Sequence, residues 1–110
     1  MSASIRDEMQ AGLRAAMRSR ERLTVSVLRS TLAAVANAEA VDPATVDRHA
    51  VEVARTALTE DDVRAVVAAE RDDLRAAVSE MQSLSQAEKA ADLAQQAAIL
   101  DGYLAGSVTA

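Results

Sequence analysis

The chain has 110 residues, half of them hydrophobic, and a formal net charge of −5 at pH 7, which together predict one domain with a single modest core. It contains no cysteine, which excludes disulfides, thiolate metal sites and a cysteine nucleophile and agrees with a reducing cytoplasm. Its charged N-terminus is unlike a signal peptide and no apolar run reaches the roughly 18 residues of a membrane span, so we expect a soluble cytoplasmic protein.

Apolar residues recur at steps of three and four along the whole chain, which predicts helices and no β-strand. The first helix is expected over residues 4–19, with the Ser4 hydroxyl as its N-cap and an apolar stripe that ends at Met17. The second helix should span residues 21–40. Pro43 then predicts the first turn of a short third helix that ends near residue 58.

Two capping signals mark the remaining helices. Thr59 with Asp62 forms a capping box at the start of a fourth helix that should reach about residue 82. Ser85 with Glu88 predicts a second capping box, at the start of a last helix that should fray by residue 106. We therefore expect an all-α bundle of about four to five helices with no β-sheet, forming one domain over residues 1–106 with a loose tail at 107–110.

The residue types of a catalytic or metal site are scarce. His49 is the only histidine, and with Glu52 it has the i, i+3 spacing of helical metal ligands, but the chain has no further His or Cys to complete such a site. We favour a partly exposed helix residue over a metal ligand. The three glycines form no phosphate-binding loop, and one histidine on a separate segment gives the serines no triad. We predict no catalytic residue, no metal and no cofactor.

Two carboxylates, Glu39 and Glu70, lie on the apolar stripes of their predicted helices. A partly buried carboxylate needs cationic or hydrogen-bonding partners, which the second helix and the arginines of later segments could supply. We favour a structural polar network that sets helix register, and the alternative is a ligand or partner pocket. The candidate members are Arg29, Asn37, Glu39, Arg55, Glu70 and Arg71.

The first thirty residues are basic, with six arginines against three acids and so a charge of +3, which leaves −8 for the remainder. The candidate RNA-binding residues in this segment are Arg14, Arg18, Arg20 and Arg22. Three or four phosphate contacts would make binding strongly salt-dependent. Tyr103 is the only aromatic residue, so the sequence offers no aromatic platform for stacking unpaired bases, and a solvated face paired with nearby acids is the competing interpretation.

A series of short motifs follows in a characteristic order. They are Ala16-Met17, Leu28-Arg29, Leu32-Ala33-Ala34, Asn37-Ala38-Glu39, the arginine-containing stretch 52–60 and Ile99-Leu100-Asp101-Gly102-Tyr103-Leu104. In this order and spacing, the chain resembles the GatB/YqeY family over essentially its whole length. The chain stops soon after Leu104, where longer members continue with a small second helical domain, so it is similar to the short form of the family.

The resemblance implies a helical fold and a relation to the transfer-RNA-dependent amidotransferase. In one component of that enzyme a related region follows the kinase-like core and approaches transfer RNA, while catalysis belongs to other domains. The resemblance thus implies a non-catalytic accessory or binding module, although the family label names carbon–nitrogen ligase activity with glutamine as amide donor. Expected partners are transfer RNA or amidotransferase subunits, with neither DNA nor a membrane. The alternative is a protein-interaction or structural module that forms a homo- or hetero-oligomer and has no RNA role.

Overall fold

A computed structural model describes residues 3–40 and 58–106 of the protein. These residues form four helices and no strand, namely α1 (Ile5–Ser19), α2 (Arg22–Glu39), α3 (Glu60–Ser83) and α4 (Ala87–Gly106). The all-α prediction is confirmed. The predicted third helix at residues 43–57 and the predicted tail at 107–110 lie outside the described residues.

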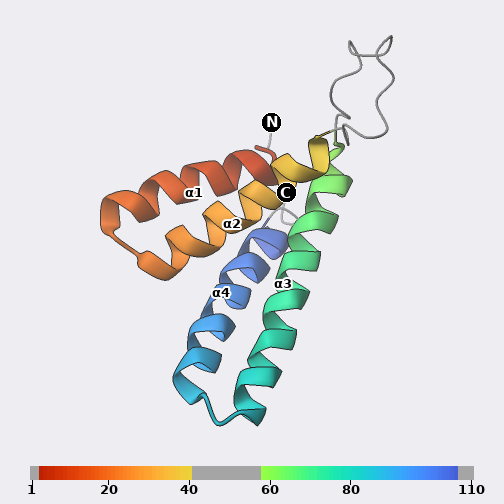
Figure 1. The fold of residues 1–110 in the computed structure, drawn as a ribbon. Helices are drawn as coiled ribbons and strands as arrows, with labels where there is room; N and C mark the ends of the chain where they lie inside the picture. Colours follow the sequence, from red (N-terminus) through yellow and green to blue (C-terminus); the bar gives the residue numbers. More distant parts are fainter. Residues whose placement is uncertain (1–2, 41–57, 107–110) are drawn as a thin grey trace.

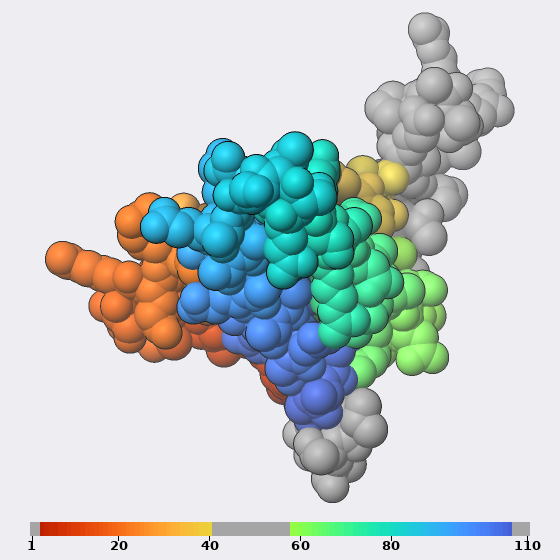
Figure 2. Space-filling model, turned by 90° about the horizontal axis from the view of Figure 1, so that it is seen from below, coloured from red at the N-terminus to blue at the C-terminus, as the bar shows by residue number. Residues whose placement is uncertain are grey.

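The helices are arranged as two antiparallel hairpins, α1–α2 and α3–α4, which meet at their open ends while their turns point in different directions (Figure 1). Seen from below, the α1–α2 turn extends to one side of the α3–α4 hairpin (Figure 2). α2 contacts both α3 and α4. The buried core lies where the hairpins meet and takes residues from all four helices, Ile5, Met9, Val27, Leu28, Val35, Val63, Val67 and Leu100.

Local signals explain both ends of α1. The Ser4 hydroxyl accepts a hydrogen bond from the Asp7 N–H at 3.1 Å, as predicted. After Ser19 the chain takes a left-handed conformation at Arg20, with φ of 56°. The Arg20 N–H donates to the Met17 carbonyl at 3.3 Å and the Glu21 N–H donates to the Ala16 carbonyl at 2.9 Å. This Schellman motif ends α1 and leaves two residues before α2.

α3 begins at the predicted capping box. The Thr59 hydroxyl accepts from the Asp62 N–H at 3.0 Å, and the Asp62 carboxylate accepts from the Thr59 N–H at 3.1 Å. Each of these hydrogen bonds gives a side-chain acceptor to a backbone N–H that has no partner within the helix, and both lie within one helical turn. This capping box could be predicted from the sequence because Thr59 and Asp62 are three residues apart and bond to each other.

The capping box predicted at Ser85 and Glu88 is wrong. Ser85 has a φ of 58° and belongs to the end of α3, where its N–H donates to the Gln82 carbonyl at 3.1 Å. The Gln86 N–H donates to the Met81 carbonyl at 2.8 Å, which completes a second Schellman motif. Because Ser85 closes the preceding helix, α4 begins only at Ala87.

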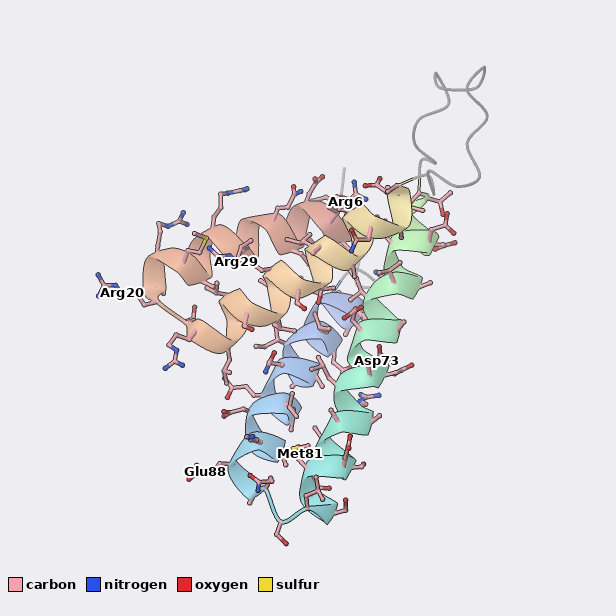
Figure 3. All side chains as sticks on the ribbon, viewed as in Figure 1. Arg6, Arg20, Arg29, Asp73, Met81 and Glu88 are labelled. Atoms are coloured by element: carbon pink, nitrogen blue, oxygen red, sulfur yellow. The ribbon has the colours of Figure 1, made fainter. Side chains whose placement is uncertain are left out.

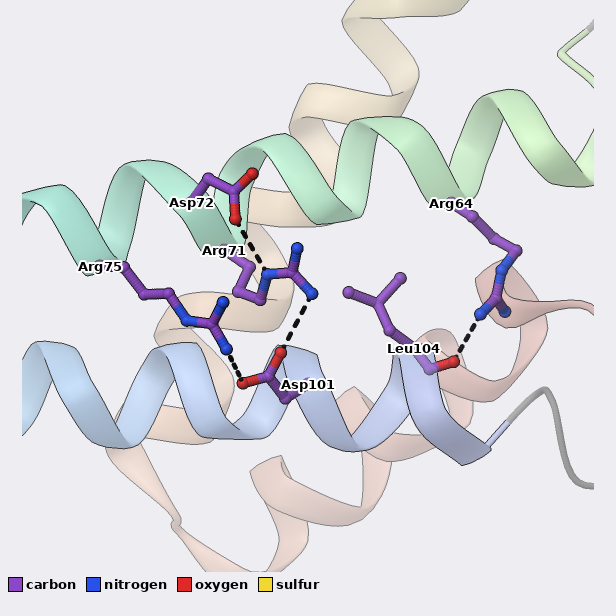
Figure 4. A network of polar contacts seen from close by, with 6 residues as sticks. All are labelled: Arg64, Arg71, Asp72, Arg75, Asp101 and Leu104. Carbon is purple, nitrogen blue, oxygen red and sulfur yellow. Dashed lines mark hydrogen bonds and ion pairs between the residues drawn. The ribbon is translucent and has the colours of Figure 1, made fainter.

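Ion pairs link α3 to α4 at their partly exposed edge (Figure 4). Asp101 on α4 accepts from Arg71 at 3.2 Å and from Arg75 at 2.7 Å, so one carboxylate joins two successive turns of α3. Nearer the end of α4, the Arg64 guanidinium donates to the Leu104 carbonyl. This hydrogen bond supplies a charged donor to one of the carbonyls that the C-terminus of α4 leaves without an intrahelical partner.

Candidate functional site

A group of exposed arginines surrounds the α1–α2 turn. We call Arg14, Arg18, Arg20, Arg22 and Arg29 the basic turn, and all five are exposed. Figure 3 shows Arg20 at the turn itself and Arg29 further along α2. Because α1 ends at Ser19, Arg22 lies on α2 and does not continue the face of Arg14 and Arg18. The arginines are gathered by the turn and not by one helix face.

None of the five arginines of the basic turn forms an ion pair with another described residue. Arginines elsewhere are engaged, since Arg6 pairs with Glu39 at 2.9 Å and both Arg71 and Arg75 pair with Asp101. The only acid within residues 14–29 is Glu21. The basic turn therefore presents positive charge that described acids do not neutralise by direct contact.

The start of α2 adds to this positive region. Glu21 occupies the N-cap position without a side-chain capping bond, and the first turn of α2 contains no acid. The free N–H groups of an uncapped helix start carry partial positive charge. Beside it is a hollow of about 420 Å³, to which α4 contributes Asp92 and Gln95. This acid on α4 limits the positive region on that side.

An open groove lies between the end of α1 and the first turns of α2. Its volume is about 770 Å³, and its lining consists of Met17, Arg20, Arg22, Val25, Ser26, Arg29 and Ser30. Met17 is 48% exposed, so the structure corrects its predicted place on the buried stripe of the first helix. The Arg29 guanidinium lies 3.8 Å from the Met17 sulfur. The groove thus combines an apolar lining with three guanidinium groups.

The polar network predicted around Glu39 is replaced by other contacts. Glu39 pairs with Arg6 on α1, whereas Arg29 contacts Met17. Asn37 is exposed on α2. The predicted members on α2 therefore do not form a common group. Sequence reasoning missed Arg6, because it is separated from Glu39 by most of two helices and by a turn.

The other predicted members also have separate surroundings. Glu70 is half-buried, and no hydrogen bond or ion pair joins its carboxylate to another residue in the described part of the chain. Arg71 contacts Asp72 at 3.1 Å and Asp101 at 3.2 Å, and its hydrogen bond to Asp72 is the main reason that its pKa is raised. Arg55 lies outside the described residues, as do His49 and Glu52.

Within residues 3–40 and 58–106, no group of three or more His, Cys, Asp or Glu side chains is placed to hold a metal ion. No helix in these ranges is long and apolar enough to cross a membrane. The basic turn and its groove are the candidate site, because five exposed arginines without ion pairs to described residues gather there beside an open groove. Comparisons of the chain with protein-family models, curated proteins and solved structures found no match.

Proposed function

We propose that this protein is a non-catalytic accessory module that binds RNA through the basic turn. The observation that carries the proposal is the convergence of five arginines without ion pairs to described residues at one end of the α1–α2 hairpin. Guanidinium groups bind phosphate oxygens in a bidentate manner and stay charged at any physiological pH. The resemblance to the GatB/YqeY family supports transfer RNA as the RNA class and amidotransferase subunits as further partners.

The charge distribution favours one mode of approach. The chain is acidic overall, with a net charge of −5, while the basic turn carries five positive charges and Glu21 is the only acid within residues 14–29. A polyanion is repelled by the acidic remainder and attracted to the basic turn, so charge alone orients the encounter. RNA contact is then confined to the α1–α2 end of the molecule.

The test is fluorescence anisotropy of labelled bulk transfer RNA titrated with the purified protein over a salt series. We expect saturable binding whose logarithmic salt slope is about −2 to −4, as for roughly three or four phosphate contacts. Arg18→Glu should weaken binding at low salt by about tenfold or more, because it removes one phosphate contact and adds repulsion.

Lys89→Glu is the matched control, since Lys89 is also an exposed helix residue without an ion pair to a described residue and the two variants have the same net charge. Its affinity should stay within about twofold of wild type, because Lys89 lies outside the basic turn. Absence of saturable binding at low salt, with the helical circular dichroism spectrum intact, would refute the proposal. The protein-interaction module would then remain, and light scattering would measure its oligomeric state.

A further inference from the structure

Met17 is an unusual side chain for a surface that only contacts phosphates. It is 48% exposed, and Leu84 is the only other large hydrophobic side chain of this kind among the described residues. Phosphate binding makes no use of a thioether. A single exposed apolar side chain is common on protein surfaces, and what sets Met17 apart is the Arg29 guanidinium beside its sulfur. The groove therefore has a feature that the arginines do not explain.

The groove brings this apolar surface together with a planar cation. Met17 and Val25 provide its apolar lining, and the Arg29 guanidinium lies 3.8 Å from the Met17 sulfur. Arginine planes are surfaces on which unpaired bases stack, and apolar side chains pack against bases that have left a duplex. A volume of about 770 Å³ is ample for a nucleobase with its ribose. Arg20 and Arg22 line the same groove and can contact the flanking phosphates.

We propose that this groove accepts the base of an unpaired RNA nucleotide, with Met17 and Arg29 against the base and Arg20 and Arg22 on the neighbouring phosphates. This inference rests on the proposed RNA-binding function and specifies which part of an RNA enters the site. The only aromatic residue, Tyr103, is packed next to Gly12 and does not line the groove. The thioether and the guanidinium take the place of an aromatic platform.

The proposal predicts a preference between two RNAs with equal numbers of phosphates, a blunt-ended duplex of two strands with no unpaired base and a hairpin with an unpaired 3′ extension. Bases inside a duplex are already stacked on one another, so they cannot cover Met17 and Val25, which stay in contact with water. We expect the extended hairpin to bind about tenfold more tightly, the effect of stacking roughly one base. Fluorescence anisotropy at fixed salt measures both affinities.

Met17→Gln keeps the length of the side chain and replaces its thioether by an amide. This variant should lose most of the preference for the extended hairpin, since only Arg29 remains against the base. It should keep the salt slope of wild type, because the arginines remain. Leu84→Gln changes the other exposed apolar side chain and should retain the preference. Independently of any variant, the methyl resonance of Met17 should shift with the extended hairpin and stay unchanged with the blunt duplex.

Equal affinity of the wild-type protein for the two RNAs, or an undiminished preference in Met17→Gln, overturns this inference and leaves the proposed function standing. An acidic peptide with a bulky apolar residue that displaces the extended hairpin better than unlabelled RNA does would overturn it in favour of a protein ligand. Failure to bind either RNA overturns both proposals.

Discussion

Tyr103 illustrates how one residue depends on a neighbour far along the chain. Its phenol lies so close to Gly12 that a Cβ at position 12 would overlap the Tyr103 hydroxyl. Burial raises the pKa of this hydroxyl, and the negative charges of Glu8 and Glu21 raise it further. The neutral phenol is therefore the form that the folded protein favours.

The raised pKa of Tyr103 predicts a loss of stability in alkaline solution. The unfolded chain releases the phenol proton near pH 10, whereas the folded protein retains it to higher pH. Between these values the folded state binds more protons, so the free energy of unfolding decreases as pH rises, and the full contribution is present below about pH 10. Urea unfolding across this range should show the decrease.

Tyr103→Phe should remove this part of the pH dependence while leaving that of other groups unchanged. Since Tyr103 is the only tyrosine, the ultraviolet absorbance of tyrosinate reports its ionisation without interference. A native titration midpoint at or below the ordinary tyrosine value would contradict the expectation.

At the scale of the helix, two glycines have opposite surroundings. Gly12 lies within α1 beneath the Tyr103 phenol, whereas a Cβ at Gly102 in α4 would meet nothing within 4 Å. Replacing glycine by alanine inside a helix usually increases stability, because alanine loses less backbone entropy on folding. The contact between α1 and α4 should reverse that effect at position 12.

We expect Gly102→Ala to raise the free energy of unfolding by about 0.5–1 kcal/mol. Gly12→Ala should lower it by about 1–3 kcal/mol, since the rigid Tyr103 ring has to move and the helices have to separate slightly. Thermal unfolding followed by circular dichroism compares the two variants directly. If Gly12→Ala were as stable as Gly102→Ala, α1 and α4 would not be packed as closely as described.

At the scale of the whole molecule, one polar contact joins the two hairpins, and another joins the start of α1 to the end of α2. The Glu60 carboxylate at the start of α3 accepts from the Ile5 N–H at the start of α1, at 2.9 Å. Arg6 joins α1 to the end of α2 through Glu39. These contacts lie where the open ends of the hairpins meet, and they help to set how the hairpins are oriented (Figure 1).

Glu60→Ala should therefore lower the free energy of unfolding by about 1 kcal/mol more than Asp61→Ala. Both residues are exposed acids in the first turn of α3 and interact similarly with its helix dipole, but only Glu60 accepts the Ile5 N–H. Urea unfolding of the two variants measures the difference. Equal losses would show that the hydrogen bond between α3 and α1 contributes no net stability.

The sequence alone determined the helical class, the start of α1 at Ser4, and the capping box at Thr59 and Asp62. Apolar periodicity and helix caps depend on residues within one or two turns, so they can be recognised without knowing the fold. The same local reasoning failed at Ser85. A serine at this position can either end the preceding helix or cap the next one, and in the structure it ends α3.

Only the tertiary structure decided which parts of each helix are covered and which charges find partners. It left Met17 exposed beside Arg29, paired Glu39 with Arg6, and placed Tyr103 next to Gly12. Periodicity defines an apolar face, but it does not state how far along that face a neighbouring helix reaches. The way the two hairpins meet determines how much of each apolar face is covered (Figure 1). The candidate groove lies on a part that is left uncovered, so it could not be found from the sequence.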